Sequence, residues 1–149
     1  MSIGIVDADR LGLIPKRYWK AHEFCFFLHD RLVELLVEYE VSGVHNILVD
    51  AFKEAITGHE KEFEDIDILE FMKKHDMVKP YKHHLVSHLV LGLTADMLHF
   101  LYEALRCFEK RKFSVGFATL RKPLKEHLLF LAWLLADQED FLTRFEGNN

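Results

Sequence analysis

The segment Phe113–Ala136 constrains the fold more than any other part of the sequence. Its last nine residues, LLFLAWLLA, carry no polar side-chain group except the indole N–H of Trp133. A helix that is apolar on every side belongs at the centre of a helical bundle rather than on its surface. Pro123 falls inside this pattern and cannot donate a backbone hydrogen bond to Thr119. The helix is therefore expected to kink or restart at Pro123.

Other helical patterns precede and follow this segment. Seven glycines and three prolines in 149 residues are too few for a chain of many short strands. Helices are expected over Lys16–Tyr39, Ser42–Ile56, Tyr81–Lys110 and Asp137–Phe145, with a shorter amphipathic helix in the acidic run after His59. The short connection around Arg111 predicts that the third long helix and the central one pack as an antiparallel hairpin. The sequence predicts an all-α protein, an antiparallel helical bundle of about four to five helices.

The first long helix shows one apolar stripe. The apolar residues that recur mostly at helical spacing are Tyr18, Phe24, Phe27, Leu28, Leu32, Leu35 and Leu36. Before this helix, residues 1–14 are expected to form an arm with little regular structure. Residues 15–149 are then expected to form a single helical-bundle domain. The polar end Gly147–Asn149 is also consistent with residues 15–149 being the N-terminal domain of a longer protein.

Several features favour a cytoplasmic protein that does not contact a membrane. The start lacks the basic and apolar regions of a signal peptide. No apolar stretch reaches about 18 residues without a charge. Cys25 and Cys107 lie in apolar helical patterns, which suits reduced, buried thiols better than a disulfide framework.

The charge is distributed unevenly, although the formal net charge of −5 gives no overall sign of nucleic-acid affinity. An acidic run spans Glu60–Glu70, and seven basic residues against one acid span Arg106–Lys125. One interpretation is that these are ordinary solvated helix ends and loops. The other is that the basic stretch forms a local anion site, because it adjoins Glu126 and His127.

Arg121 and His127 are the first candidates for chemistry. An imidazole can act as general acid or base near neutral pH, and a guanidinium can hold a phosphate through two hydrogen bonds. On an ideal helix the two side chains point about 120° apart. They would converge only through a kink at Pro123 or through a second subunit. Alternatively, Arg121 pairs with Glu126 or a helix end, and His127 only marks the boundary.

A second candidate is metal binding by His84 and His88, which share one helical face at a spacing that zinc sites use. His99 lies about 16 Å beyond His88 along a helix and cannot share the ion. Further ligands would have to come from another helix, with His22, Glu23, His29, Glu34 and Glu38 as the choices. Two histidines at this spacing also occur by chance, and no cofactor is predicted.

The segment KRKFSVGFATLRKPLKEHLLFLAWLLAD resembles the second half of HEPN-type helical domains. In that family a basic turn precedes Leu-Arg-x-apolar-apolar-x-Glu and an apolar run, here Leu120–Glu126. Nucleolytic members carry Arg, four to six residues and then His, which Arg121 and His127 match. Lys122 and Pro123 depart from the pattern of active members.

The resemblance implies a dimer with this motif near its two-fold axis, in a defence or toxin–antitoxin setting. The implied role is metal-independent RNA cleavage, or RNA or nucleotide binding. His127 would transfer the proton, Arg121 would contact phosphate and Glu126 would orient them. Lys122 and Lys125 would add phosphate contacts.

The alternative function is a non-catalytic helical domain for protein interaction or dimerisation. Several branches of the HEPN superfamily are of this kind, and similarity in fold need not bring the reaction. A metal-binding helical bundle is the third hypothesis. The expected partners are therefore a second copy of the chain, RNA or a nucleotide, or another protein.

Overall fold

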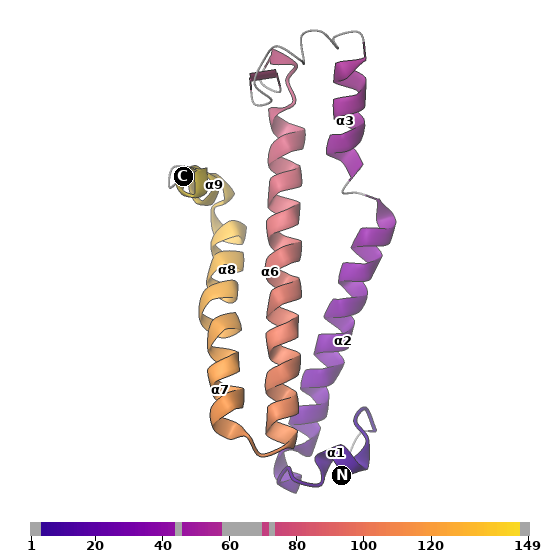
Figure 1. Ribbon diagram of the computed structural model, residues 1–149, viewed down its shortest axis with the longest axis vertical. Coiled ribbons are helices and arrows are strands. Elements are labelled where there is room, and N and C mark those ends of the chain that lie inside the picture. The colour runs from indigo at the N-terminus through magenta and orange to yellow at the C-terminus, as the bar shows by residue number, and fades with distance from the viewer. Residues whose placement is uncertain (1–3, 44–45, 58–69, 72–73, 147–149) are drawn as a thin grey trace. The chain divides into compact units, whose positions relative to one another are not determined.

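The computed structural model describes residues 4–43, 46–57, 70–71 and 74–146. Every regular element in these ranges is helical, with about four main helices, which confirms the all-α fold class (Figure 1). The elements are α1 (Ala8–Leu11), η1 (Lys16–Tyr18), α2 (Trp19–Ser42), α3 (Ile47–Ile56), α6 (Val78–Glu109), α7 (Phe113–Lys122), η3 (Pro123–His127), α8 (Leu128–Ala136) and α9 (Gln138–Glu146).

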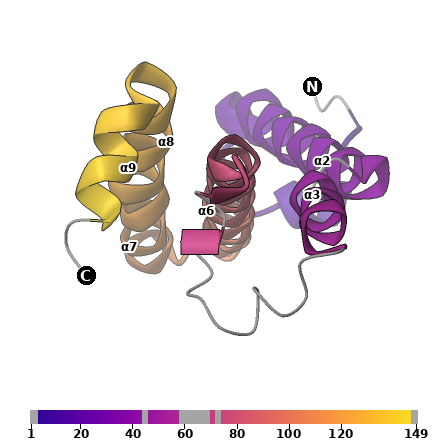
Figure 2. The same ribbon diagram turned by 90° about the horizontal axis from the view of Figure 1, so that it is seen from above.

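The chain divides into two compact units. The first comprises Met1–Leu36 and Gly92–Asn149, and the second comprises Val37–Leu91. Within the first unit, α6 lies between α2 and the continuous rod that α7, η3 and α8 form (Figure 2). Within the described part of this unit these helices lie side by side, with α2 and the rod as the two outer ones.

An antiparallel hairpin joins α6 to α7, as the short connection predicts. Arg111 adopts a positive φ of 55° in the turn, and the Lys112 amide donates to the carbonyl of Cys107 at 2.9 Å. The Phe108 ring then lies 5.2 Å from the Phe117 ring. A Cβ at Gly116 would come within 2.5 Å of the Phe108 ring, so only glycine allows this close approach.

Pro123 neither breaks the rod nor restarts it. It opens the π-helical turn η3, which ends where the Leu128 amide donates to the carbonyl of Pro123. Proline has no N–H to donate and its ring crowds the preceding turn, and one wider turn accommodates both effects. The kink expected at this position is thus a π-bulge within a continuous helix.

The N-terminal arm packs on the first unit and includes the one-turn helix α1. The Glu23 carboxylate on α2 accepts the backbone N–H groups of Gly4 at 2.9 Å, Ile5 at 3.2 Å and Val6 at 3.5 Å. The buried apolar cluster of this unit is Val6, Leu11, Ile14, Phe26 and Leu105. The arm therefore supplies much of the core, which its weak periodicity does not indicate.

The expected helix boundaries hold with two corrections. The second helix is predicted to begin at Ser42, yet Ser42 is the last residue of α2 and α3 begins at Ile47. The residues up to Pro80 are predicted as a connection, yet α6 begins at Val78 and includes Pro80 in its first turn. A helix tolerates proline there because the first amides have no intrahelical partner in any case. The short helix expected in the acidic run lies almost entirely outside the described residues.

The apolar stripe of α2 does not coincide with its buried face. Within the first unit the buried residues of α2 are His22, Glu23 and Phe26. Large apolar residues of the stripe that are exposed are Tyr18, Phe24, Phe27, Leu28 and Leu35. The arm and the end of α6 cover the more polar side of α2, where Phe26 and His29 contact the ring of Tyr102 on α6.

By length and composition alone, α6 could also cross a membrane. One such helix is weak support for a membrane protein, because core helices of soluble proteins pass the same test.

Candidate functional site

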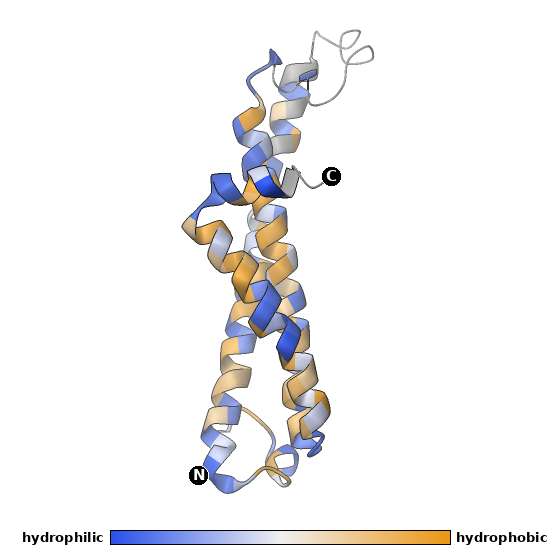
Figure 3. Cartoon of the chain, turned by 90° about the vertical axis from the view of Figure 1, so that its left-hand side faces the viewer, coloured by the Kyte–Doolittle hydropathy of each residue, from blue (hydrophilic) through white to orange (hydrophobic). Residues whose placement is uncertain are grey.

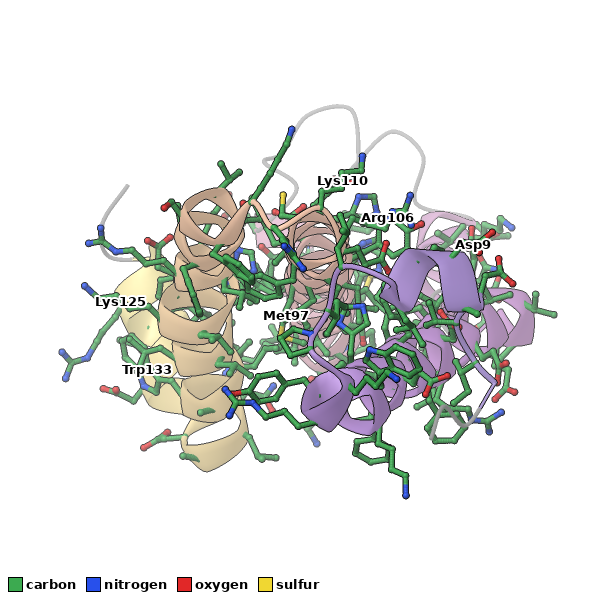
Figure 4. The ribbon with its side chains drawn as sticks, turned by 90° about the horizontal axis from the view of Figure 1, so that it is seen from below. Asp9, Met97, Arg106, Lys110, Lys125 and Trp133 are labelled. Atoms are coloured by element: carbon green, nitrogen blue, oxygen red, sulfur yellow. The ribbon has the colours of Figure 1, made fainter. Side chains whose placement is uncertain are left out.

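The charged residues around Pro123 are exposed on the rod. Arg121, Lys122, Lys125 and Glu126 are all exposed. Figure 4 shows Lys125 projecting outward from the rod, away from α6. The Lys122 ammonium also lies 4.9 Å from the centre of the Phe100 ring, a cation–π distance.

His127 has the opposite environment. It is only 3% exposed, and its ring centre lies 5.9 Å from that of Phe100 on α6. Its Nδ1 atom is buried and has no hydrogen-bond partner among the described residues. A general acid or base must come within hydrogen-bond reach of its substrate. In the single chain the imidazole is almost fully covered and packs against Phe100.

Arg121 and His127 are near in sequence, but Arg121 is exposed and His127 is buried. Within the described chain no hydrogen bond joins the guanidinium of Arg121 to His127 or to Glu126. The catalytic roles of these three residues and the phosphate-binding role of Lys122 and Lys125 stay predictions.

The histidine pair lies in the second unit. The rings of His84 and His88 are 4.1 Å apart at 70°, so they are neighbours on one face of α6. Among the described residues no three His, Cys, Asp or Glu side chains form a group that could hold a metal ion. Four of the proposed further ligands already have partners: His22 contacts Glu109, Glu23 accepts backbone N–H groups of the arm, His29 contacts Asp30, and Glu34 pairs with Arg31. Metal binding by His84 and His88 stays a prediction.

A buried ionic cluster at the end of α6 is a feature that the sequence analysis missed. Glu109 is 5% exposed, and its carboxylate accepts hydrogen bonds from Arg10 at 2.7 Å, Arg106 at 2.6 Å and His22 at 3.2 Å. Figure 4 shows Arg106 at this end of α6, close to α1. We call these four residues the Glu109 cluster. The only sequence signal is an acid within an aromatic helical segment, RCFE, whose main partner lies 99 residues away.

The cluster keeps Glu109 ionised. Burial by itself raises the pKa of this carboxyl, but the hydrogen bonds from Arg10 and His22 and the charges of Arg10 and Arg106 outweigh it. The net effect is a pKa below the ordinary value of 4.5. The carboxylate thereby ties the arm, α2 and α6 together.

The apolar helix α8 is the other unexpected feature, because it is not the buried centre of this chain. Leu134 is 6% exposed, whereas its neighbour Leu135 is 91% exposed. On its covered side the ring of Trp133 lies 5.1 Å from that of Phe141 on α9, and the indole N–H donates to Asp140 at 3.0 Å. The central position predicted for this helix is wrong for the single chain.

The exposed side of α8 is continuous. On a helical wheel five of its six exposed residues, Leu128, Leu129, Ala132, Leu135 and Ala136, fall within an arc of about 120°, and Phe130 lies outside it. We call this set the α8 outer face. Figure 3 shows the apolar colour running along the rod between two hydrophilic segments. A side chain such as Leu135 loses favourable burial worth about 1.5–3 kcal/mol when it stays in water.

Charges of opposite sign bound the α8 outer face. Arg121, Lys122 and Lys125 lie before it and are exposed. Asp137 and Glu139, also exposed, lie after it, beside Asp140. The hydrogen bond from Arg144 lowers the pKa of Asp140, so this carboxylate too is charged near neutral pH. Basic residues thus precede the α8 outer face along the rod, and acidic residues follow it.

Comparison with protein-family models, with curated protein sequences and with solved structures gives no significant match for this chain.

Proposed function

We propose that the chain is a helical self-association domain in which two copies pair through the α8 outer face. The observation that carries this proposal is the contrast between Leu134 and Leu135, adjacent leucines that are 6% and 91% exposed. One side of α8 serves the protomer fold, and the other is equally apolar but uncovered. Contiguous exposed apolar surface of this kind marks association sites.

An antiparallel pairing about a two-fold axis fits the residue pattern of this face. If the axis passes close to Ala132, residues equally far from it on either side face each other across the interface. Leu129 then meets Leu135 of the second copy, and Leu128 meets Ala136. The small side chain of Ala132 lets the two helices approach closely at their crossing point.

The charges favour the same orientation. Lys125 lies on η3 and Glu139 on α9, and no ion pair joins them among the described residues. Antiparallel pairing would bring the basic residues before the α8 outer face of one copy beside the acidic residues after it in the other. A parallel pairing would place like charges together and would align the helix dipoles unfavourably.

This dimer agrees with what the HEPN resemblance implies. The antiparallel hairpin of α6 and α7, with a second copy against α8, would give the antiparallel helical bundle expected from the sequence. It would also move α8 to the centre of the assembly, where an apolar helix is most stable.

The test is the molar mass of the purified protein by analytical ultracentrifugation over a range of concentrations. The wild type is expected to dimerise, and Leu135→Glu to raise the dissociation constant by at least about 100-fold, because a carboxylate would enter an apolar interface. Leu35→Glu on α2 is the matched control, since Leu35 is also exposed but lies away from α8. A monomeric wild type, or equal effects of both substitutions, would refute the proposal.

RNA cleavage remains the second proposal, and the exposed basic cluster Arg121, Lys122 and Lys125 is what favours it. The test incubates tag-free protein with RNA beside Arg121→Ala and His127→Ala variants. Turnover by the wild type that both variants lose would support catalysis. Equal background turnover in all three proteins would exclude it.

A further inference from the structure

An apolar cavity of about 370 Å³ lies in the first unit, apart from the α8 outer face. It is bounded by the start of α2, the end of α6 and the start of α7. Its walls include Tyr18, Ala21, His22, Cys25, Phe108 and Phe117. Three of the lining residues, Tyr18, Cys25 and Phe117, are exposed, so the cavity is accessible from solvent.

His22 supplies the polar wall of this cavity. The residue is 7% exposed, and its Nε2 lies 3.2 Å from Oε1 of Glu109. An ionised carboxylate can only accept, so the proton of this hydrogen bond belongs to Nε2. In the neutral ring Nδ1 is then an acceptor, and the hydrogen bond to Glu109 through Nε2 is the one recorded for this ring among the described residues. The Glu109 cluster thus fixes the tautomer of a histidine that lines an apolar space.

The remaining walls indicate what could occupy this space. No Lys, Arg, Asp or Glu lies among the residues that line the described cavity. The nearby guanidinium groups of Arg10 and Arg106 are already bound to Glu109. A charged ligand would lose its hydration and gain no partner. Since a dry cavity of about 150 Å³ accommodates benzene, this one has room for about two fused rings.

We propose that the cavity binds one uncharged, largely apolar molecule of about two-ring size, whose single O–H or N–H group donates to Nδ1 of His22. Pockets of this size with mostly aromatic walls and one placed polar group are typical of small-molecule sites. The Phe108 and Phe117 rings would contact the faces or edges of the ligand. This site does not depend on dimerisation.

The experiment uses 2-naphthol as probe and the full chain as receptor. Binding is measured by calorimetry, and the alkylation rate of Cys25 by N-ethylmaleimide is followed by mass spectrometry. Cys25 lines the cavity, whereas Cys107 does not and serves as the internal control. Saturable binding of one probe per chain, with slower alkylation of Cys25 alone, is expected.

Two comparisons locate the probe and its hydrogen bond. Ala21→Phe fills the cavity from an exposed wall position and should weaken binding at least tenfold, whereas Ala118→Phe, exposed on α7 outside the cavity, should not. 2-Methoxynaphthalene lacks the donor and should bind about threefold to tenfold more weakly than 2-naphthol. Absence of saturable binding, unchanged binding by Ala21→Phe, or equal affinity of both probes would overturn the proposal.

Discussion

The Glu109 cluster and the α8 outer face distribute polarity in opposite ways within one unit. At the end of α6 the protein buries a carboxylate among Arg10, Arg106 and His22. Along α8 it leaves Leu129 and Leu135 in water. The first arrangement is complete, because each buried charge has an opposite partner. The second is incomplete, because among the described residues none covers the α8 outer face.

This difference separates folding from assembly. A closed network such as the Glu109 cluster acts on the free energy of unfolding of one chain. An exposed apolar face contributes little to that quantity and acts instead on the contact with a partner. Substitutions in the two regions should therefore change different measurements.

The largest expected contrast is between the neighbours Leu134 and Leu135. Leu134→Ala should lower the free energy of unfolding of the single chain by about 2–4 kcal/mol, because it removes a buried side chain. Leu135→Ala should change it by less than about 0.5 kcal/mol. Urea unfolding at protein concentrations below the dissociation constant of the dimer measures both. Similar losses for the two variants would mean that both faces of α8 belong to the protomer fold.

The next effect concerns Glu109 itself. Glu109→Gln should lower the free energy of unfolding by about 1–3 kcal/mol, because two guanidinium groups lose their anion. Glu103→Gln on the same helix is the control, since Glu103 is exposed. The dimer dissociation constant should not change in either variant. If Glu109→Gln weakened dimerisation and Glu103→Gln did not, the Glu109 cluster would contribute to association as well as to folding, which would contradict the comparison.

The same carboxylate predicts a dependence of stability on pH. The folded chain holds the pKa of Glu109 below 4.5, so the unfolded chain binds the proton more readily. The stabilisation is complete above about pH 4.5 and is lost as the pH falls through the lower, folded-state pKa. Urea unfolding from pH 7 to pH 3 should show a steeper loss for the wild type than for Glu109→Gln. Parallel curves would show that Glu109 contributes nothing to acid unfolding.

The smallest expected effect is the charge pairing at the ends of the α8 outer face. Lys125→Glu or Glu139→Lys alone should weaken dimerisation about twofold to tenfold, because exposed ion pairs contribute roughly 0.2–1 kcal/mol each. The double variant should recover wild-type association in sedimentation measurements at low salt. Additive weakening in the double variant would favour a parallel pairing or another interface.

The sequence could predict the fold class and most helices, because these depend on local periodicity and turn residues. The hairpin of α6 and α7 and an irregularity at Pro123 followed from short-range rules. The Glu109 cluster could not be predicted, because Arg10 and Glu109 are 99 residues apart and only the packing of the arm joins them. The cavity beside His22 likewise forms from three separate segments of the chain.

The sequence by itself determined that α8 is a strongly apolar helix. It also determined that basic residues precede this helix and acidic residues follow it. Only the tertiary structure decided which of its faces this chain covers. Periodicity predicts the buried side of a helix when the other side is polar. Because α8 is apolar on every side, its sequence pattern does not predict which side is buried. The burial of Leu134 and the exposure of Leu135 depend on where α6 and α9 pack, and no single segment encodes that choice.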